Sequence, residues 1–218
     1  AERSGLIVDI GRWVLQEACR QMAAWRRDGY PAFVLAVNLS PVEFHRGNIE
    51  SAIASILQSS EIDPAYLELE LTESTLIQDS EKFMLSLKKL KALGVRIAID
   101  DFGTGFSSLA YFQSLSIDVI KIDRSFITDI VTDGRDRNLT AAVVALAHRL
   151  GIAVVTEGVE AAEQAEVVRS LGCNAAQGFL YSPAVPAAEI DAMLAAGGLP
   201  VARRAPVQGP LRSSRATG

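Results

Sequence analysis

The chain has 218 residues, of which 49% are hydrophobic and 22% are charged, and its formal net charge is −5 at pH 7. This length allows one large α/β domain or two small ones, and it is sufficient for a full hydrophobic core. The acidic balance argues against a general groove for nucleic-acid polymers. The sequence has no apolar run of 18 residues that would encode a membrane-spanning helix.

The chain begins with AERSG, which is neither an initiator Met nor a signal peptide, so we expect a domain excised from a longer protein. Its two cysteines, Cys19 and Cys173, are far apart and lack metal-ligand spacing. This pattern favours two inert thiols in a reducing compartment, and we expect the cytoplasm. We expect no membrane contact from this segment, and the sequence leaves open a membrane anchor elsewhere in the parent protein. We assign residues 1–196 to the domain and residues 197–218, which are rich in Gly, Pro, Ser and Arg, to a flexible basic tail.

Hydrophobic periodicity and turn residues predict helices that alternate with short strands. In chain order we expect a helix over residues 1–27, a strand over 33–38, a helix over 47–58, a strand over 66–71, a helix over 80–93, a strand over 95–100, a helix over 107–113, a strand over 118–122, a helix over 138–150, a strand over 152–156, a helix over 161–171, a strand over 173–176 and a helix over 187–195. The fifth helix of this series is expected to pack on the core through the stripe Leu139, Val143, Leu146 and Leu150.

The six predicted strands are separated by lengths typical of βα units, which favours a parallel sheet. Right-handed crossovers would bring all six carboxyl ends to one face. The polar side chains at these ends are Asn38, Glu70, Asp100, Lys121, Glu157 and Gln177. Such a ring of polar groups predicts the mouth of a TIM-like (β/α) barrel. An open doubly wound sheet would more often carry a Gly-rich phosphate loop, and the sequence has no GxGxxG or Walker pattern.

Two adjacent carboxylates, Asp100 and Asp101, end the third predicted strand, and a turn built on Gly103 and Gly105 follows directly. Neighbouring anions at the end of a buried strand repel each other and are costly to desolvate. A metal pair, a shared proton or simple solvation in an exposed turn would each resolve this conflict. We place a metal first, because hard divalent cations choose carboxylate oxygens.

Taken singly, the other strand-end residues are weak evidence for a site. Asn38 precedes Leu-Ser-Pro and is more often a turn former, Lys121 could be an ordinary edge residue, and Glu157 could be a solvated strand end. Neither histidine, His45 or His148, fits a catalytic or metal-binding role well. His148 is expected at the surface or partly buried.

Taken together, five oxygen-donor side chains converge on one rim: Asn38, Glu70, Asp100, Asp101 and Glu157. This set suits one or two Mg²⁺ or Mn²⁺ ions and suits Zn²⁺ poorly, because Zn²⁺ would favour His or Cys. Two hard cations can activate a water for displacement at phosphorus, and Lys121 could orient that water. The residues therefore favour metal-dependent hydrolysis of a phosphate ester. The DFG sequence at 101–103 does not indicate a protein kinase, since no Gly-rich loop or HRD sequence accompanies it.

Six motifs, in this order and spacing, resemble the EAL-domain cyclic-di-GMP phosphodiesterases: VNLSP, LELTES, DDFGTGFSSL, IKIDRSF, TEGVE and QGFLYSP. The resemblance covers roughly residues 4–190 and implies a TIM-like barrel with one antiparallel strand. It also implies two Mg²⁺ or Mn²⁺ ions and hydrolysis of one phosphodiester of cyclic di-GMP to linear pGpG. The partners that it implies are a second copy in a homodimer and sensor or diguanylate-cyclase-like domains in the parent chain.

By motif, the resemblance implies that Asn38 and Glu70 hold one metal ion. Asp101 and Glu157 would hold the second ion, and Asp100 would bridge the pair.

Further roles follow from the same resemblance. Lys121 matches the lysine that positions the attacking water and, with Glu157, is the predicted catalytic residue. Glu73 matches the glutamate that braces the Asp-Asp loop. The remaining supporting or substrate-binding positions are Asp123, Glu160 and Gln177.

The chain departs from the family in one respect, because the Glu-Ala-Leu motif does not occur in it. By comparison with the family, we expect one metal ligand, two strands and a helix to lie upstream of this sequence. A barrel without its first two strands would have two open edges. We favour a truncated enzyme, since the downstream ligand positions are intact, and we expect little or no turnover from these residues alone. The alternative is an inactive EAL domain that senses cyclic di-GMP or docks a partner protein.

Overall fold

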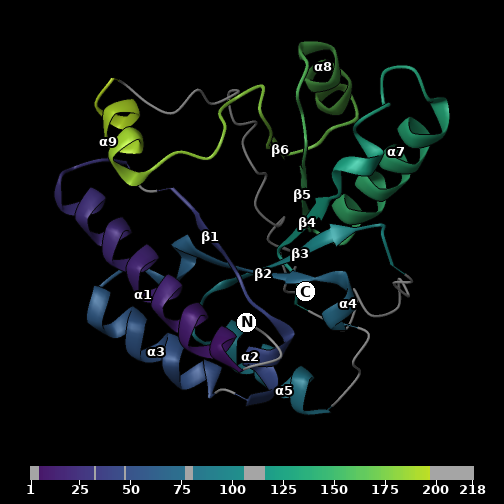
Figure 1. Cartoon of the computed structure of the whole chain (residues 1–218). Coiled ribbons are helices and arrows are strands. Elements are labelled where there is room, and N and C mark those ends of the chain that lie inside the picture. Colours follow the sequence, from purple (N-terminus) through teal and green to yellow (C-terminus); the bar gives the residue numbers. More distant parts are fainter. Residues whose placement is uncertain (1–4, 32, 47, 77–80, 106–115, 197–218) are drawn as a thin grey trace, which may run out of the picture.

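The computed structural model describes residues 5–31, 33–46, 48–76, 81–105 and 116–196. In these ranges, six parallel strands form one sheet in sequential order from β1 to β6. They are β1 (Leu35–Asn38), β2 (Leu67–Thr72), β3 (Arg96–Phe102), β4 (Val119–Ile122), β5 (Ala153–Thr156) and β6 (Ala175–Ala176). The sheet curls into a half-barrel, with α1 and α3 beside its first strands and α7 and α8 beside its last ones (Figure 1). This architecture confirms the predicted parallel α/β class.

The helices follow the strands in the predicted alternation. They are α1 (Leu6–Arg27), α2 (Pro41–Arg46), α3 (Ile49–Ser60), α4 (Glu73–Leu76), α5 (Glu81–Ala92), α7 (Gly134–Arg149), α8 (Ala162–Ser170) and α9 (Ala187–Ala195), with 3₁₀ turns η2 (Pro64–Tyr66) and η3 (Arg124–Phe126). Helices α2 and α4 and both 3₁₀ turns were not predicted, whereas the predicted helix over 107–113 and the predicted tail lie outside the described residues. No described helix is both long and apolar enough to cross a membrane.

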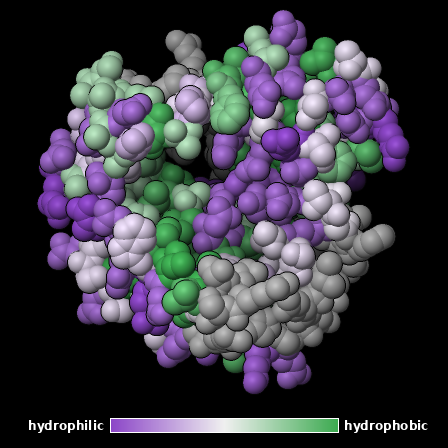
Figure 2. All heavy atoms as spheres, in the orientation of Figure 1, coloured by the Kyte–Doolittle hydropathy of each residue, from purple (hydrophilic) through white to green (hydrophobic). Residues whose placement is uncertain are grey.

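The core lies between the sheet and the outer helices. Leu67, Leu69 and Leu71 of β2 are fully buried, as are Leu15 and Cys19 of α1. Hydrophobic side chains also gather on the face of the molecule over α1 and β1 (Figure 2). Strands β1 and β6 each have one neighbour among the described residues, so they form the two open edges of the half-barrel.

Helix α7 differs from the prediction in both its start and its buried face. It begins at Gly134, because Asp133 caps it by accepting a hydrogen bond from the backbone N–H of Arg135. Its fully buried residues are Thr140, Val144 and Ala147, whereas Leu139 of the predicted stripe is 43% exposed. Val143 and Leu150 of the predicted stripe are partly buried and pack against the core, so the prediction is confirmed in part. The most buried line of the helix lies one position further along the chain.

Both cysteines are free thiols. Burial raises the pKa of Cys19 to about 11 and the pKa of Cys173 to about 12. Because the thiolate is the reactive form, both side chains are chemically inert near neutral pH, as the sequence predicted.

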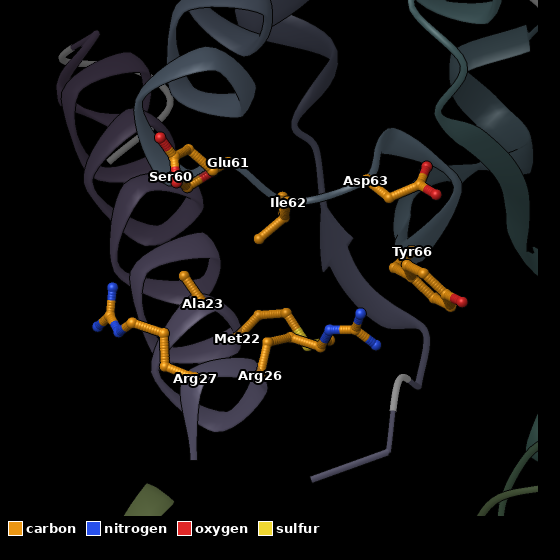
Figure 3. Close-up of a pocket in the computed structure, with 9 residues that line it drawn as sticks. All are labelled: Met22, Ala23, Arg26, Arg27, Ser60, Glu61, Ile62, Asp63 and Tyr66. Carbon is orange, nitrogen blue, oxygen red and sulfur yellow. The ribbon is translucent and has the colours of Figure 1, made fainter. Parts of the chain in front are cut away.

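A cavity of about 350 Å³ lies at the end of the sheet where the strands begin. It is bounded by α1 and by the segment that joins α3 to β2 (Figure 3). Met22 and Ile62 contribute to its apolar side, and the guanidinium carbon of Arg26 lies 5.6 Å from the centre of the Tyr66 ring. The cavity is therefore at the opposite end of the strands from the predicted site.

Gly11 of α1 is the point at which this helix contacts α2. A Cβ at this position would overlap the carboxylate of Glu43, which is 2% exposed and accepts a hydrogen bond from the backbone N–H of Ser40. Gly11→Ala should therefore lower the free energy of unfolding by about 1–3 kcal/mol through overpacking. Gly134→Ala is the control, because a Cβ there has no neighbour within 4 Å. Urea denaturation measures the difference, and equal stability of the two variants would contradict this account.

Candidate metal centre

Lys121 of β4 lies at the centre of an acidic cluster and is only 5% exposed. Its Nζ atom is 2.7 Å from Glu70 Oε1, 2.6 Å from Glu157 Oε1 and 3.3 Å from Asp100 Oδ1. These carboxylates belong to β2, to the residue that follows β5 and to β3, respectively. Four neighbouring strands therefore bring their polar side chains together, as the sequence predicted. We call Lys121 and these three acids the Lys121 cluster.

Asp101 joins this cluster because β3 contains an irregularity. Adjacent side chains on a regular strand point to opposite faces of the sheet. The register between β3 and β4 shifts between Ile99 and Phe102, and Asp101 has a left-handed backbone with φ 53°. This β-bulge allows Asp100 and Asp101 to serve the same site. Together with Glu157, they offer carboxylate oxygens that all lie within 4.8 Å of one another.

The site has more negative than positive charge among its described residues. Burial raises the pKa of Glu157 despite the hydrogen bond from Lys121. Burial and the neighbouring charge of Asp100 also raise the pKa of Asp101. Burial alone would lower the pKa of Lys121, but its hydrogen bonds to Glu157 and Glu70 raise it above the ordinary value. The one ammonium of Lys121 therefore offsets the charge of the four carboxylates only in part. A set of hard oxygen donors with excess negative charge fits divalent cations.

Glu73, the first residue of α4, fixes the loop that follows the two aspartates. The side chain is 2% exposed, and its Oε2 atom accepts hydrogen bonds from the backbone N–H groups of Gly103 (2.8 Å) and Gly105 (3.3 Å). Gly103 has φ 101°, a conformation that favours glycine. A Cβ at Gly105 would lie 2.9 Å from Glu73 Oε1, so the loop approaches this carboxylate closely.

The remaining predicted residues lie at or just beyond the carboxyl ends of the strands. Asn38 ends β1 beside Glu70 in the strand register, and Gln177 directly follows β6. Glu160 lies in the connection from β5 to α8, and Asp123 caps η3 by accepting a hydrogen bond from the Ser125 N–H. In the described ranges, no side-chain hydrogen bond or ion pair joins Asn38, Glu160 or Gln177 to the cluster.

His148 is not among the residues that contact Lys121. His148 is exposed and its Nε2 atom lies 3.1 Å from Asn174 Oδ1, as expected for a surface residue. The side chain of His45 lies outside the described part of the structure.

Sequence reasoning missed two features near the site. Glu68, two residues before Glu70 on β2, forms an ion pair with Arg96 at 3.2 Å. The sequence places Glu68 on the same face as Glu70, since residues two apart on a strand share a face, but it does not indicate Arg96 as its partner. Gln164 forms hydrogen bonds with the backbone of Glu160 and with the backbone of Ile127, in two different loops. Its position three residues after the N-cap of α8 was the sequence signal for the first of these bonds.

The family model described as the EAL domain matches residues 1–184 of this chain. The chain belongs to the EAL domain family. Within this family, the bifunctional diguanylate cyclase/cyclic di-GMP phosphodiesterase MucR of Pseudomonas aeruginosa is 45% identical over 196 residues. This match covers 89% of the chain but 28% of MucR, so the chain spans less than a third of that relative.

Solved EAL-domain structures share the fold. The PaMucR phosphodiesterase in complex with c-di-GMP aligns with a TM-score of 0.83 and 44% identity, over 87% of this chain and 76% of that one. The Klebsiella pneumoniae BlrP1 complex with manganese and cyclic di-GMP aligns with a TM-score of 0.71 and 30% identity, over 82% of this chain and 44% of that one. These comparisons confirm the TIM-like class. The manganese belongs to the BlrP1 complex, and in this chain Asp100, Asp101 and Glu157 offer carboxylate oxygens that lie within 4.8 Å of one another.

Proposed function

We propose that this EAL domain hydrolyses one phosphodiester of cyclic di-GMP to linear pGpG with the help of two Mg²⁺ or Mn²⁺ ions. The convergence of Glu70, Asp100 and Glu157 on Lys121 is the observation that carries this proposal. The name of MucR, and the cyclic di-GMP in the PaMucR structure, support the choice of substrate.

The oxygen donors of the rim would divide between the two ions. Asn38 and Glu70 would hold one, Asp101 and Glu157 the other, and Asp100 both. When bound, the ions supply positive charge to the phosphate oxygens and lower the pKa of a water molecule. The carboxylates present a rigid set of donors for this purpose, because each belongs to a strand, or to the residue after one, of the same sheet.

Lys121 would orient the attacking water and offset charge that develops on the phosphate. Its raised pKa keeps the ammonium charged near neutral pH, so it acts as a hydrogen-bond donor rather than as a base. Glu73 would hold the loop of Gly103 and Gly105 in place beside the metals. Asp123, Glu160 and Gln177 would form the outer wall of the site.

The alternative is an inactive EAL domain that binds cyclic di-GMP or docks a partner protein. In either case we propose a cytoplasmic domain of residues 1–196, acting as a homodimer within a protein that carries sensor or diguanylate-cyclase-like domains. The size of MucR relative to this chain supports such a multidomain parent.

Incubation of the chain with cyclic di-GMP and Mn²⁺, followed by chromatography of the nucleotides, tests the proposal. We expect nucleotide binding that is lost in EDTA, and pGpG formation that is slow at most, since the chain lacks the Glu-Ala-Leu glutamate. Any pGpG that disappears in EDTA would support the enzyme. Metal-dependent binding with no pGpG from a protein extended upstream through the segment that aligns with the Glu-Ala-Leu motif would favour the sensor. A folded protein that neither binds nor cleaves the nucleotide would contradict both.

A further inference from the structure

Gln164, in the first turn of α8, uses all the hydrogen-bonding capacity of its side chain. The residue is 9% exposed. Its Oε1 atom accepts hydrogen bonds from the backbone N–H groups of Glu160 (2.8 Å) and Ala161 (3.0 Å). Its Nε2 atom donates to the carbonyl oxygens of Ile127 and Thr128, both at 3.1 Å. One buried amide therefore joins two loops that are far apart in the sequence.

These two loops carry predicted functional residues. The first, residues 157–161, connects β5 to α8 and contains Glu157 and Glu160; we call it the β5–α8 loop. The second, residues 123–133, connects β4 to α7 and begins with Asp123; we call it the β4–α7 loop. From the first turn of α8, Gln164 thus links the loop that follows Lys121 to the loop that contains Glu157.

The β5–α8 loop needs such support, because strand pairing ends where it begins. The backbone N–H of Glu157 donates to the Ile122 carbonyl at 3.0 Å, which is the last bond that continues the β4–β5 ladder. The next residue, Gly158, turns away with φ 70° and packs so closely on Arg124 that a Cβ would overlap that side chain. Beyond this turn, Val159 bonds to the backbone of residue 177 and Gln164 holds residues 160 and 161.

We infer that Gln164 is a positioning residue that keeps Glu157 and Glu160 on the rim of the metal centre by locking the β5–α8 loop against the β4–α7 loop. A capping glutamine would need only its bonds to Glu160 and Ala161. The additional bonds from Nε2 reach 36 and 37 residues back along the chain, to the loop that follows Lys121. The inference rests on the proposed function, in which Glu157 holds a metal ion.

The test compares Gln164→Met, which removes all four hydrogen bonds, with Gln164→Glu, which keeps the two accepted bonds and removes both donors. Val168→Ala is the matched control, because Val168 is 2% exposed and lies one turn further along the same helix without contributing to these bonds. Mn²⁺ affinity is measured by electron paramagnetic resonance. Hydrogen–deuterium exchange of residues 157–161 is measured without metal, and thermal unfolding is recorded for each variant.

We expect Gln164→Met to weaken Mn²⁺ binding by about tenfold or more, as loss of groups that orient metal ligands commonly does. Exchange in residues 157–161 should accelerate in Gln164→Met, and also in Gln164→Glu, because its second carboxylate oxygen would face the carbonyl oxygens of Ile127 and Thr128. Val168→Ala should lower the unfolding temperature while leaving both the Mn²⁺ affinity and this exchange unchanged. Parental affinity and exchange in Gln164→Met would overturn the inference. A parent chain that binds no Mn²⁺ would overturn the proposed metal site instead, and the exchange rates alone would then decide whether Gln164 positions the loop.

Discussion

Lys121→Met should lower the free energy of unfolding of the metal-free protein by about 3–5 kcal/mol near neutral pH. The substitution removes the one ammonium that contacts Glu70, Asp100 and Glu157, while methionine fills most of the same volume. Three closely spaced carboxylates then remain without their cation: Glu70, which is buried, and Asp100 and Glu157, which are partly buried. Urea denaturation in EDTA measures the loss, and added Mn²⁺ should restore much of it because a divalent ion replaces the missing charge.

The same variant should show a characteristic dependence on pH. Burial already raises the pKa of Glu157 in the folded protein, and loss of Lys121 removes a group that lowers it. An acid whose pKa is higher in the folded state than in the unfolded state destabilises the fold as pH rises through that window. The deficit of Lys121→Met should therefore be smaller at about pH 5 than at about pH 8.

Lys91→Met is the control for both measurements. Lys91 pairs with Asp118 at 2.6 Å, but both side chains are more than a quarter exposed and the pair lies outside the Lys121 cluster. Its loss should cost about 1 kcal/mol or less, with no recovery in Mn²⁺. If Lys121→Met loses no more stability than Lys91→Met, or gains nothing from Mn²⁺, the proposed charge balance is wrong.

Asp100→Asn should weaken Mn²⁺ binding strongly and lower any phosphodiesterase rate by about 10²-fold or more. Asp100 is the proposed bridge, so the substitution removes negative charge from both ions while keeping the shape of the side chain. It also leaves β3 intact, since the Asp101 N–H can still donate to the retained carbonyl oxygen at this position. Titration of the chain with Mn²⁺ measures the affinity, and chromatography of pGpG measures the rate.

Asp63→Asn is the matched control for this substitution. Asp63 caps η2 at the opposite end of the sheet by accepting a hydrogen bond from the Ala65 N–H. It should leave Mn²⁺ affinity unchanged and alter stability only slightly, because asparagine is also a good cap. Equal Mn²⁺ affinities of the parent and Asp100→Asn would exclude Asp100 as a shared ligand.

The strand ends could be predicted from the sequence because their pattern is local. Each apolar run that ends in a polar residue marks one strand, and the lengths between these runs favour parallel βα units. The sequence alone therefore predicted correctly that Asn38, Glu70 and Lys121 lie at the carboxyl edge of the sheet, without information on long-range contacts. The order of the strands followed from the same short connections.

The sequence could not predict features that depend on contacts between distant segments. The bulge at Asp100 and Asp101 is a matter of register between β3 and β4, and a motif of two aspartates does not reveal it. The buried face of α7 depends on how the helix is rotated against the rest of the fold, and in the structure Thr140 is buried whereas Leu139 is 43% exposed. The hydrogen bonds that Gln164 donates to Ile127 and Thr128 join residues more than 35 positions apart, and hydrophobic periodicity cannot predict them.

Residue chemistry alone left three explanations for the Asp100–Asp101 pair: metal, a shared proton or solvation. The structure favours a metal, because carboxylate oxygens of Asp100, Asp101 and Glu157 lie close together and Glu157 also contacts a buried ammonium. The choice of substrate has a different origin, since none of these distances specifies a guanine nucleotide. It depends on the family to which the chain belongs.

The position of Mn²⁺ in a crystal of the chain is the most direct test of the metal centre. An anomalous difference map should show manganese between the carboxylates of Asp100, Asp101 and Glu157, with Lys121 retained beside them. Crystals of Asp100→Asn grown in the same way should lose that peak. An empty cluster in the parent at saturating Mn²⁺, or manganese bound only elsewhere, would contradict the account.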